Sequence, residues 1–139
     1  MLKLLAPEAG MSVLDVGAGS GWTTALLARL VGPAGSVIGV ELEPDIAQWG
    51  AANLRRQHTP WAALHLAQRG ILGWPGEAPY DRILVSAGAK EIPQELVEQL
   101  DDDAVMVLVV SGTLLRLQQI GGSAPTVTQH GSYRFVPLR

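Results

Sequence analysis

The glycine-rich run at residues 13–21 (VLDVGAGSG) constrains the fold more strongly than any other part of the chain. An apolar, β-prone segment at residues 11–16 leads into it, and residues 22–31 have the composition of a helix that stops at a Gly-Pro pair. Glycines at the end of a strand let the backbone turn sharply and approach a ligand, and the following helix presents unpaired N–H groups. The run therefore predicts a strand, a loop and a helix around a nucleotide-like ligand.

β-prone runs and helical patterns alternate through the middle of the chain. The predicted strands lie at residues 36–41, 62–67, 82–86 and 105–110, and the predicted helices begin at Pro44 and span residues 92–100. The last of these strands is apolar at every position, which is typical of a strand covered on both faces. This alternation predicts a mostly parallel sheet with helices on both faces.

The last part of the chain contains strands without helices between them. The β-prone runs are residues 113–120, 126–130 and 133–138, with breaker residues at 121–125. Strands joined by such short connections pair antiparallel. We therefore expect an α/β fold, a Rossmann-like three-layer sandwich that ends in an antiparallel hairpin.

Length and composition exclude several classes of protein. The chain has 139 residues, which predicts a single domain over residues 1–139, and a net charge of −3 without a basic cluster, so nucleic acid is not an expected partner. The apolar stretch at residues 104–110 is far shorter than the ~20 residues that a membrane-spanning helix needs, so no membrane association is expected. Because the chain has no cysteine and no export signal, we expect it in the cytoplasm.

Two acidic residues flank the predicted ligand. Asp15 precedes the first glycine of the loop, where a carboxylate suits a cationic or amine-bearing ligand and would repel a pyrophosphate. Glu41 ends the second predicted strand, where it can accept hydrogen bonds from both ribose hydroxyls. S-adenosylmethionine carries an ammonium group, a ribose and no phosphate, and is therefore the expected cofactor. The alternative is that each carboxylate only caps a loop amide.

Other residue patterns argue against competing chemistries. Trp22 stands where a dinucleotide fingerprint has its third glycine, so an NAD-dependent oxidoreductase is disfavoured. His58, His65 and His130 are not spaced as metal ligands, and no metal site is expected.

Several longer phrases resemble the core of protein-L-isoaspartate O-methyltransferases. They lie in residues 13–41, in residues 70–100 with the phrases LGWP and APYDR, and in the ending RFVPL. The resemblance implies a class I S-adenosylmethionine-dependent methyltransferase fold with a seven-stranded sheet. It also implies methyl transfer to the free carboxylate of an L-isoaspartyl residue in a damaged protein or peptide.

The resemblance implies cofactor contacts position by position. The loop around the methionine and ribose parts would consist of Asp15, Gly17, Ala18, Gly19 and Gly21. Glu41 would hold the ribose hydroxyls, Leu42 would pack on the adenine, and Ser86 and Ala87 would lie near the sulfonium. No catalytic residue is assigned, because a carboxylate acceptor is already ionised at neutral pH and needs no general base.

The chain departs from the family pattern in two places. The family has Gly-Asp-Gly, whose acid recognises the adenine amino group, where this chain has Gln68-Arg69-Gly70. A guanidinium has no acceptor, so Arg69 cannot replace that acid, whereas Gln68 offers an amide oxygen. Members of the family also have an N-terminal segment before the position that corresponds to Met1. That segment contains a Ser/Thr-containing loop that receives the peptide.

Two functions therefore stay open. The first is an S-adenosylmethionine-dependent O-methyltransferase of the isoaspartyl type, weakly active or inactive as this chain alone. The second is a catalytically impaired cofactor-binding or assembly module of the same fold. Uncovered strand edges and apolar surface also favour a homo-oligomer.

Overall fold

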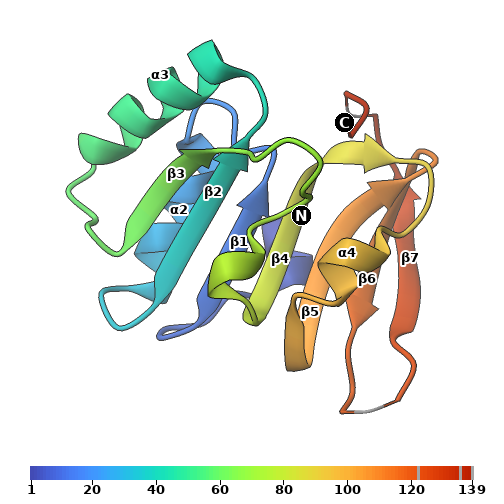
Figure 1. Cartoon of the computed structure of the whole chain (residues 1–139). Helices are drawn as coiled ribbons and strands as arrows, with labels where there is room; N and C mark the ends of the chain where they lie inside the picture. Colours follow the sequence, from blue (N-terminus) through green and yellow to red (C-terminus); the bar gives the residue numbers. More distant parts are fainter. Residues whose placement is uncertain (122, 135, 139) are drawn as a thin grey trace.

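A computed structural model describes residues 1–121, 123–134 and 136–138 of the chain. These residues form a seven-stranded sheet with the strand order β3-β2-β1-β4-β5-β6-β7 (Figure 1). The strands are β1 (Ser12–Val16), β2 (Ser36–Glu41), β3 (Ala62–Leu66), β4 (Tyr80–Ala89), β5 (Leu100–Val110), β6 (Thr113–Gln118) and β7 (Thr126–Ser132). The predicted α/β architecture, with a mostly parallel seven-stranded sheet and an antiparallel end, is confirmed.

The first five strands run parallel, and their order reverses in the middle of the sheet. β1 pairs with β2 on one side and with β4 on the other. The chain therefore leaves the carboxyl ends of β1 and β4 in opposite directions, which opens a crevice between them. This crevice is the place where open α/β sheets bind their ligands.

Helices cover both faces of the sheet. α2 (Trp22–Val31) and α3 (Pro44–Arg55) share an apolar cluster on one face of the sheet, and α2 is partly hidden behind β2 in Figure 1. The short α4 (Gln94–Val97) and the 3₁₀ helix η1 (Pro75–Glu77) lie in front of the sheet in the same view. The short α1 (Leu2–Leu5) shares its apolar cluster with α2. In the described part of the chain, no helix has the length and apolar character that crossing a membrane requires.

Alternate residues of β1 supply the two apolar layers of the core. Val13 belongs to one cluster with Leu27 of α2, and Leu14 belongs to the opposite cluster with Leu96 of α4. All four side chains are completely buried. Because each such burial contributes about 1.5–3 kcal/mol, both helix layers are held to the sheet at its centre.

The predicted helix at residues 92–100 is wrong over most of its length. α4 has only four residues, and Leu100 already begins β5, where it pairs with Tyr80. The buried side chain of Gln99 donates a hydrogen bond of 2.9 Å to the Glu95 carbonyl, a contact that accompanies the end of the helix. Pairing with β4 therefore outweighs the helical spacing of the local sequence.

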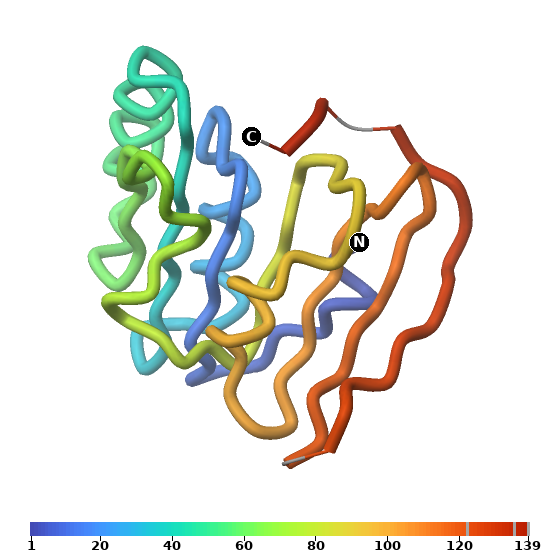
Figure 2. The backbone as a smooth tube through the Cα atoms, turned by 45° about the vertical axis from the view of Figure 1, so that its right-hand side comes forward, coloured from blue at the N-terminus to red at the C-terminus, as the bar shows by residue number. Residues whose placement is uncertain are grey.

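The C-terminal hairpin is present, but the predicted strand at residues 133–138 is wrong. β6 and β7 pair antiparallel, as expected, whereas Tyr133 and Arg134 belong to no strand. Figure 2 shows the chain beyond β7 returning over the top of the sheet. Phe135, part of the same prediction, lies outside the described residues.

This returning segment attaches to the end of β4. The N–H of Gly88 donates to the Val136 carbonyl and the N–H of Leu138 donates to the Gly88 carbonyl, each at 2.7 Å. Pro137 thereby forms an isolated parallel bridge with Gly88. The backbone groups of Gly88 thus hold the segment across the sheet, which is the physical reason that it does not continue as another strand of the hairpin.

Candidate functional site

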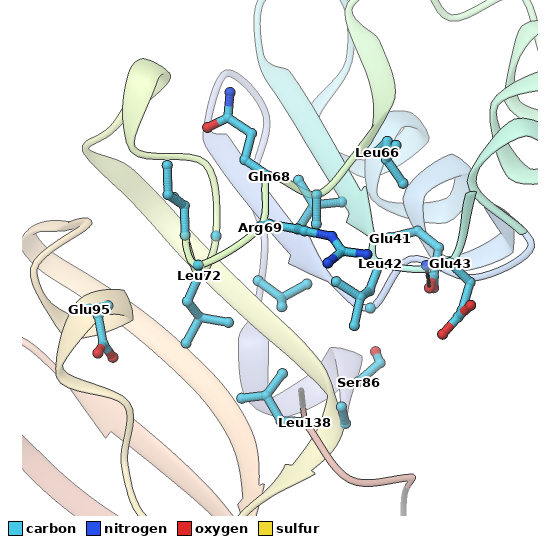
Figure 3. Close-up of a pocket in the computed structure, with 18 of the residues that line it drawn as sticks. Glu41, Leu42, Glu43, Leu66, Gln68, Arg69, Leu72, Ser86, Glu95 and Leu138 are labelled. Carbon is cyan, nitrogen blue, oxygen red and sulfur yellow. Dashed lines mark hydrogen bonds between the residues drawn. The ribbon is translucent and has the colours of Figure 1, made fainter.

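A cavity of about 890 Å³ lies at the carboxyl ends of the central strands (Figure 3). Its walls come from the ends of β1, β2, β3 and β4 and from the C-terminal segment. Seven of the eleven residues considered for the cofactor site line it, and they are Gly17, Glu41, Leu42, Gln68, Arg69, Ser86 and Ala87. The structure therefore brings most of the predicted site together in one crevice.

Glu41 is held rigidly at the end of β2. Its Oε1 accepts a hydrogen bond of 3.0 Å from the N–H of Gly19, and its Oε2 accepts one of 3.0 Å from the N–H of Glu43. Glu41 therefore caps two loop amides in this structure. An ionised carboxylate has about four acceptor positions, so the same group keeps capacity for two hydroxyl donors.

The glycine loop is tied to β2 by its backbone. The N–H groups of Gly17 and Ala18 both donate to the Val40 carbonyl at 2.9 Å. Gly17 has a φ of +81°, which residues with a Cβ atom disfavour, so the turn needs a glycine at this position. Gly17 borders the cavity, whereas Ala18, Gly19 and Gly21 do not line it.

Asp15 lies on the opposite side of β1 from the cavity. It is completely buried, and its Oδ2 accepts a hydrogen bond of 2.8 Å from the Thr24 hydroxyl of α2. Its Oδ1 has no hydrogen-bond partner within the described structure. Burial raises the pKa of the Asp15 carboxyl to about 6, which the Thr24 bond opposes and the charge of Glu41 reinforces. The sequence did not indicate this direction of the side chain.

Gln68 and Arg69 occupy a turn after β3, but their side chains diverge. The N–H of Ile71 donates to the Gln68 carbonyl at 3.1 Å, and Gly70 has a φ of +74°, which closes the turn. In Figure 3 the amide of Gln68 points away from Glu41, while Arg69 extends toward it. That the Gln68 amide oxygen replaces the acid of the family stays a prediction.

The wall after β3 is fixed by side chains that the sequence did not mark. The buried Gln99 accepts from the N–H of Trp74 at 3.0 Å and donates to the Leu72 carbonyl at 2.9 Å. The Tyr80 hydroxyl donates to the Trp74 carbonyl at 2.5 Å, and burial together with the charge of Glu77 raises the pKa of Tyr80 to about 12. This wall therefore has a defined backbone position.

Several cavity residues were absent from the predicted site. They include Glu43, Leu66, Ile71, Leu72, Glu95 and Leu138. Leu72 and Leu138 lie in the segments LGWP and RFVPL, which carry the family resemblance, so the sequence could have indicated these two residues. The exposed Glu95 follows the end of β4 in a short helix, and no local pattern placed it at the cavity. Ala87, also expected near the cofactor, lines the cavity beside Ser86.

Comparison with known proteins matches the chain over its full length. The model of a family described as protein-L-isoaspartate(D-aspartate) O-methyltransferase (PCMT) covers residues 1–139. A Methanopyrus kandleri protein-L-isoaspartate O-methyltransferase is 40% identical over 99% of this chain, and a Triticum aestivum one is 42% identical over 94%. The chain spans 63% and 60% of the lengths of these curated relatives.

Solved structures share the fold. A protein-L-isoaspartate O-methyltransferase superposes with a TM-score of 0.90 at 23% identity, over 99% of this chain and 45% of that chain. A Plasmodium falciparum structure in complex with S-adenosyl-L-homocysteine has a TM-score of 0.82 at 21% identity, over 99% and 71% of the two chains. These likenesses establish the fold, and the full-length family match establishes the relationship. The chain therefore belongs to the protein-L-isoaspartate O-methyltransferase family.

Proposed function

We propose that residues 1–139 act as one S-adenosylmethionine-binding methyltransferase domain that methylates the free carboxylate of isoaspartyl residues in a protein or peptide. The observation that carries this proposal is the position of Glu41, which two backbone N–H groups fix at the edge of the cavity. The names of the relatives and the ligand of the Plasmodium falciparum structure support the same cofactor and reaction.

The residues around the cavity fit an adenosyl sulfonium. Glu41 would accept from the ribose hydroxyls, and Leu42 with Leu66 offers apolar surface to the base. The glycine loop approaches with its backbone at Gly17, and no phosphate-binding cluster of basic residues is needed. The completely buried Asp15, whose Oδ1 lacks a partner, adds negative charge behind the loop that would favour a cationic ligand.

The chemistry requires little from the protein beyond alignment. When bound, S-adenosylmethionine supplies a methyl group on a positively charged sulfur, with a neutral thioether as leaving group. Ser86 and Ala87 border the cavity at β4, and Val136–Leu138 border it from the C-terminal segment. These groups would orient the acceptor and exclude water, and such positioning can account for several kcal/mol of barrier lowering.

A second candidate function is a cofactor-binding or assembly module without efficient catalysis. Arg69, which cannot accept a hydrogen bond from the adenine amino group, favours it.

Calorimetry and a methylation assay together test both candidates. The chain should bind S-adenosylhomocysteine, and Glu41→Gln should weaken binding by roughly tenfold or more, because a hydrogen-bonded charged acceptor is lost. Glu91→Gln removes the same charge at an exposed position outside the cavity and should bind as wild type. No binding by the wild type would refute the proposed cofactor.

The acceptor is tested with a peptide that contains isoaspartate and the same peptide with aspartate. Methylation of the isoaspartyl peptide alone would support the enzyme, and tight cofactor binding without methylation would favour the second candidate. Cytoplasmic location and homo-oligomer formation stay predictions.

A further inference from the structure

Two tryptophans are exposed on the helices that cover one face of the sheet. Trp22 begins α2 and is 69% exposed, and Trp49 lies in the middle of α3 and is 57% exposed. Burial of a tryptophan side chain removes about 150–250 Å² from water, so the fold leaves a large apolar area uncovered here. Exposed apolar surface of this kind marks interaction sites.

Both tryptophans line a groove of about 490 Å³ between α2 and α3. Within the described structure, this groove shares no lining residue with the cavity at the carboxyl ends of the strands. The two helices approach so closely that a Cβ at Gly21 would lie 2.7 Å from the Gly50 carbonyl oxygen. These glycines are the chain neighbours of the two tryptophans, so the close approach brings both tryptophans to one end of the groove.

Each helix has the same spacing from its tryptophan to an arginine. In α2, Arg29 follows Trp22 by seven residues, and the C-cap of α3, Arg56, follows Trp49 by the same number. Seven residues span two helical turns, about 10 Å, and both helices run in the same direction because each connects two parallel strands. Arg29 also donates a hydrogen bond of 2.9 Å to the side chain of Gln57, which lines the groove beside Arg56. The two arginines therefore lie at the opposite end of the groove from the tryptophans.

The charge of this face is opposite to that of the whole chain, whose net charge is −3. α2 contains Arg29 and no acid, and α3 with its C-cap contains Arg55, Arg56 and, in the first turn, Asp45. Among the described residues that line the groove, Arg56 is the single charged side chain, and it donates a hydrogen bond of 3.1 Å to the neutral Asn53. A guanidinium has five N–H donors, so this bond leaves donors for a carboxylate.

We propose that the groove between α2 and α3 binds an acidic peptide segment of a partner protein. An apolar side chain of that segment packs against Trp22 and Trp49, and carboxylates about 10 Å farther along it pair with Arg29 and Arg56. An extended peptide advances about 3.3 Å per residue, so the acids stand about three positions from the apolar residue. This surface is a second binding site, separate from the proposed cofactor site.

A second copy of this chain is a poorer match to the groove. The run of consecutive acids in the chain is residues 101–103. It follows Leu100, which packs against a core cluster, and it leads into the buried Ala104. This run therefore has no exposed apolar neighbour to offer to the tryptophans, which favours a different protein as the partner.

Titration of the whole chain with the peptide Leu-Leu-Ser-Ser-Glu-Glu, blocked at both ends, tests the proposal. In ¹H–¹⁵N spectra the peptide should shift the indole N–H signals of Trp22 and Trp49. The signals of Trp61 and Trp74 serve as internal controls, because neither residue lines the groove and the Trp61 indole donates to the Ala28 carbonyl at 2.7 Å. Calorimetry should show weaker binding at higher salt, and much weaker binding when glutamine replaces both glutamates or serine replaces both leucines.

Substitutions in the groove give the second part of the test. Trp49→Ala should weaken binding of the peptide roughly tenfold, and Arg56→Gln should weaken it about threefold. Lys90→Gln removes the same charge from an exposed position outside the groove and should bind as wild type. Thermal unfolding checks that each variant is folded, and Arg56→Gln provides the test by itself if the alanine variant is not.

Three results would overturn the proposal. They are no binding of the peptide at millimolar concentration, equal affinity for the glutamate and glutamine peptides, and equal affinity of wild type and Arg56→Gln. Light scattering adds a fourth outcome: a dimer of the wild-type chain that Trp49→Ala dissociates would assign the groove to a second copy and would also overturn the proposal.

Discussion

Thr24 on α2 donates a hydrogen bond of 2.8 Å to Asp15 on β1, and both residues are completely buried between the sheet and that helix. Asp15↔Gly39 is a register pair of β1 and β2, and a Cβ at Gly39 would lie 2.8 Å from the Thr24 hydroxyl oxygen. The glycine of β2 therefore makes room for the hydroxyl that partners the buried acid.

The raised pKa of Asp15 predicts a pH-dependent stability. Burial raises this pKa from 3.8 to about 6, so between these values the folded chain holds a proton that the unfolded chain has released. Stability should therefore fall as pH rises through this window, by about 2 kcal/mol between pH 4.5 and pH 7.5. Urea unfolding of wild type and Asp15→Asn at both pH values measures it, and the asparagine variant should lack this component. The same pH dependence in both proteins would contradict the assignment.

Removal of the Thr24 hydroxyl should destabilise the chain. Thr24→Val keeps the shape of the side chain but leaves both oxygens of Asp15 without a protein donor, which should cost about 1–3 kcal/mol. It should also raise the pKa of Asp15, because the lost bond lowers it in the wild type. Thr24→Ser retains the hydroxyl and serves as the control in urea unfolding. Similar stabilities for the valine and serine variants would argue against an energetic role for the bond.

The contact between α3 and the glycine loop should tolerate no side chain at Gly50. A Cβ there would overlap the Gly19 carbonyl oxygen and lie 2.9 Å from Cδ1 of Leu64. Gly50→Ala should cost about 1–3 kcal/mol of stability and weaken binding of S-adenosylhomocysteine, because the loop must move. Gly76→Ala adds the same methyl group where nothing lies within 4 Å, and should be neutral in thermal unfolding and calorimetry. Wild-type affinity of Gly50→Ala would show that the loop position is not critical.

Gln99 should control the order of the wall after β3. Gln99→Leu removes the acceptor of the Trp74 N–H and the donor to the Leu72 carbonyl, so buried backbone groups lose their partners. We expect a loss of about 2–3 kcal/mol in stability and faster amide hydrogen exchange at residues 72–74. Gln99→Glu can still accept from Trp74 and should protect that amide better than leucine does. Unchanged exchange in Gln99→Leu would contradict the proposed support.

The sequence predicted the elements whose signals are local. The glycine loop at residues 13–21 depends on backbone conformations that glycine favours, and Gly17 has the positive φ that this reasoning requires. Glu41 could be placed at the cavity because the carboxyl ends of parallel strands lie at the same edge of the sheet, where such folds bind their ligands.

Other features needed contacts between distant residues. The sequence indicated that Asp15 ends a strand near the loop, but the direction of its side chain depends on Thr24 and Gly39 in neighbouring elements. The helix predicted at residues 92–100 yielded to the pairing of Leu100 with Tyr80. Local spacing cannot include such competing partners.

The amino-acid sequence alone determined the class of fold, the glycine loop and the acid at the end of β2. These features depend on strand periodicity, turn residues and strand direction, which short segments of sequence determine locally. Only the tertiary structure decided that Asp15 faces α2, that Gln99 supports the wall after β3 and that the C-terminal segment binds Gly88. The physical reason is that a buried polar group takes its hydrogen-bond partner from whichever element folds against it, however far away that element lies in the chain.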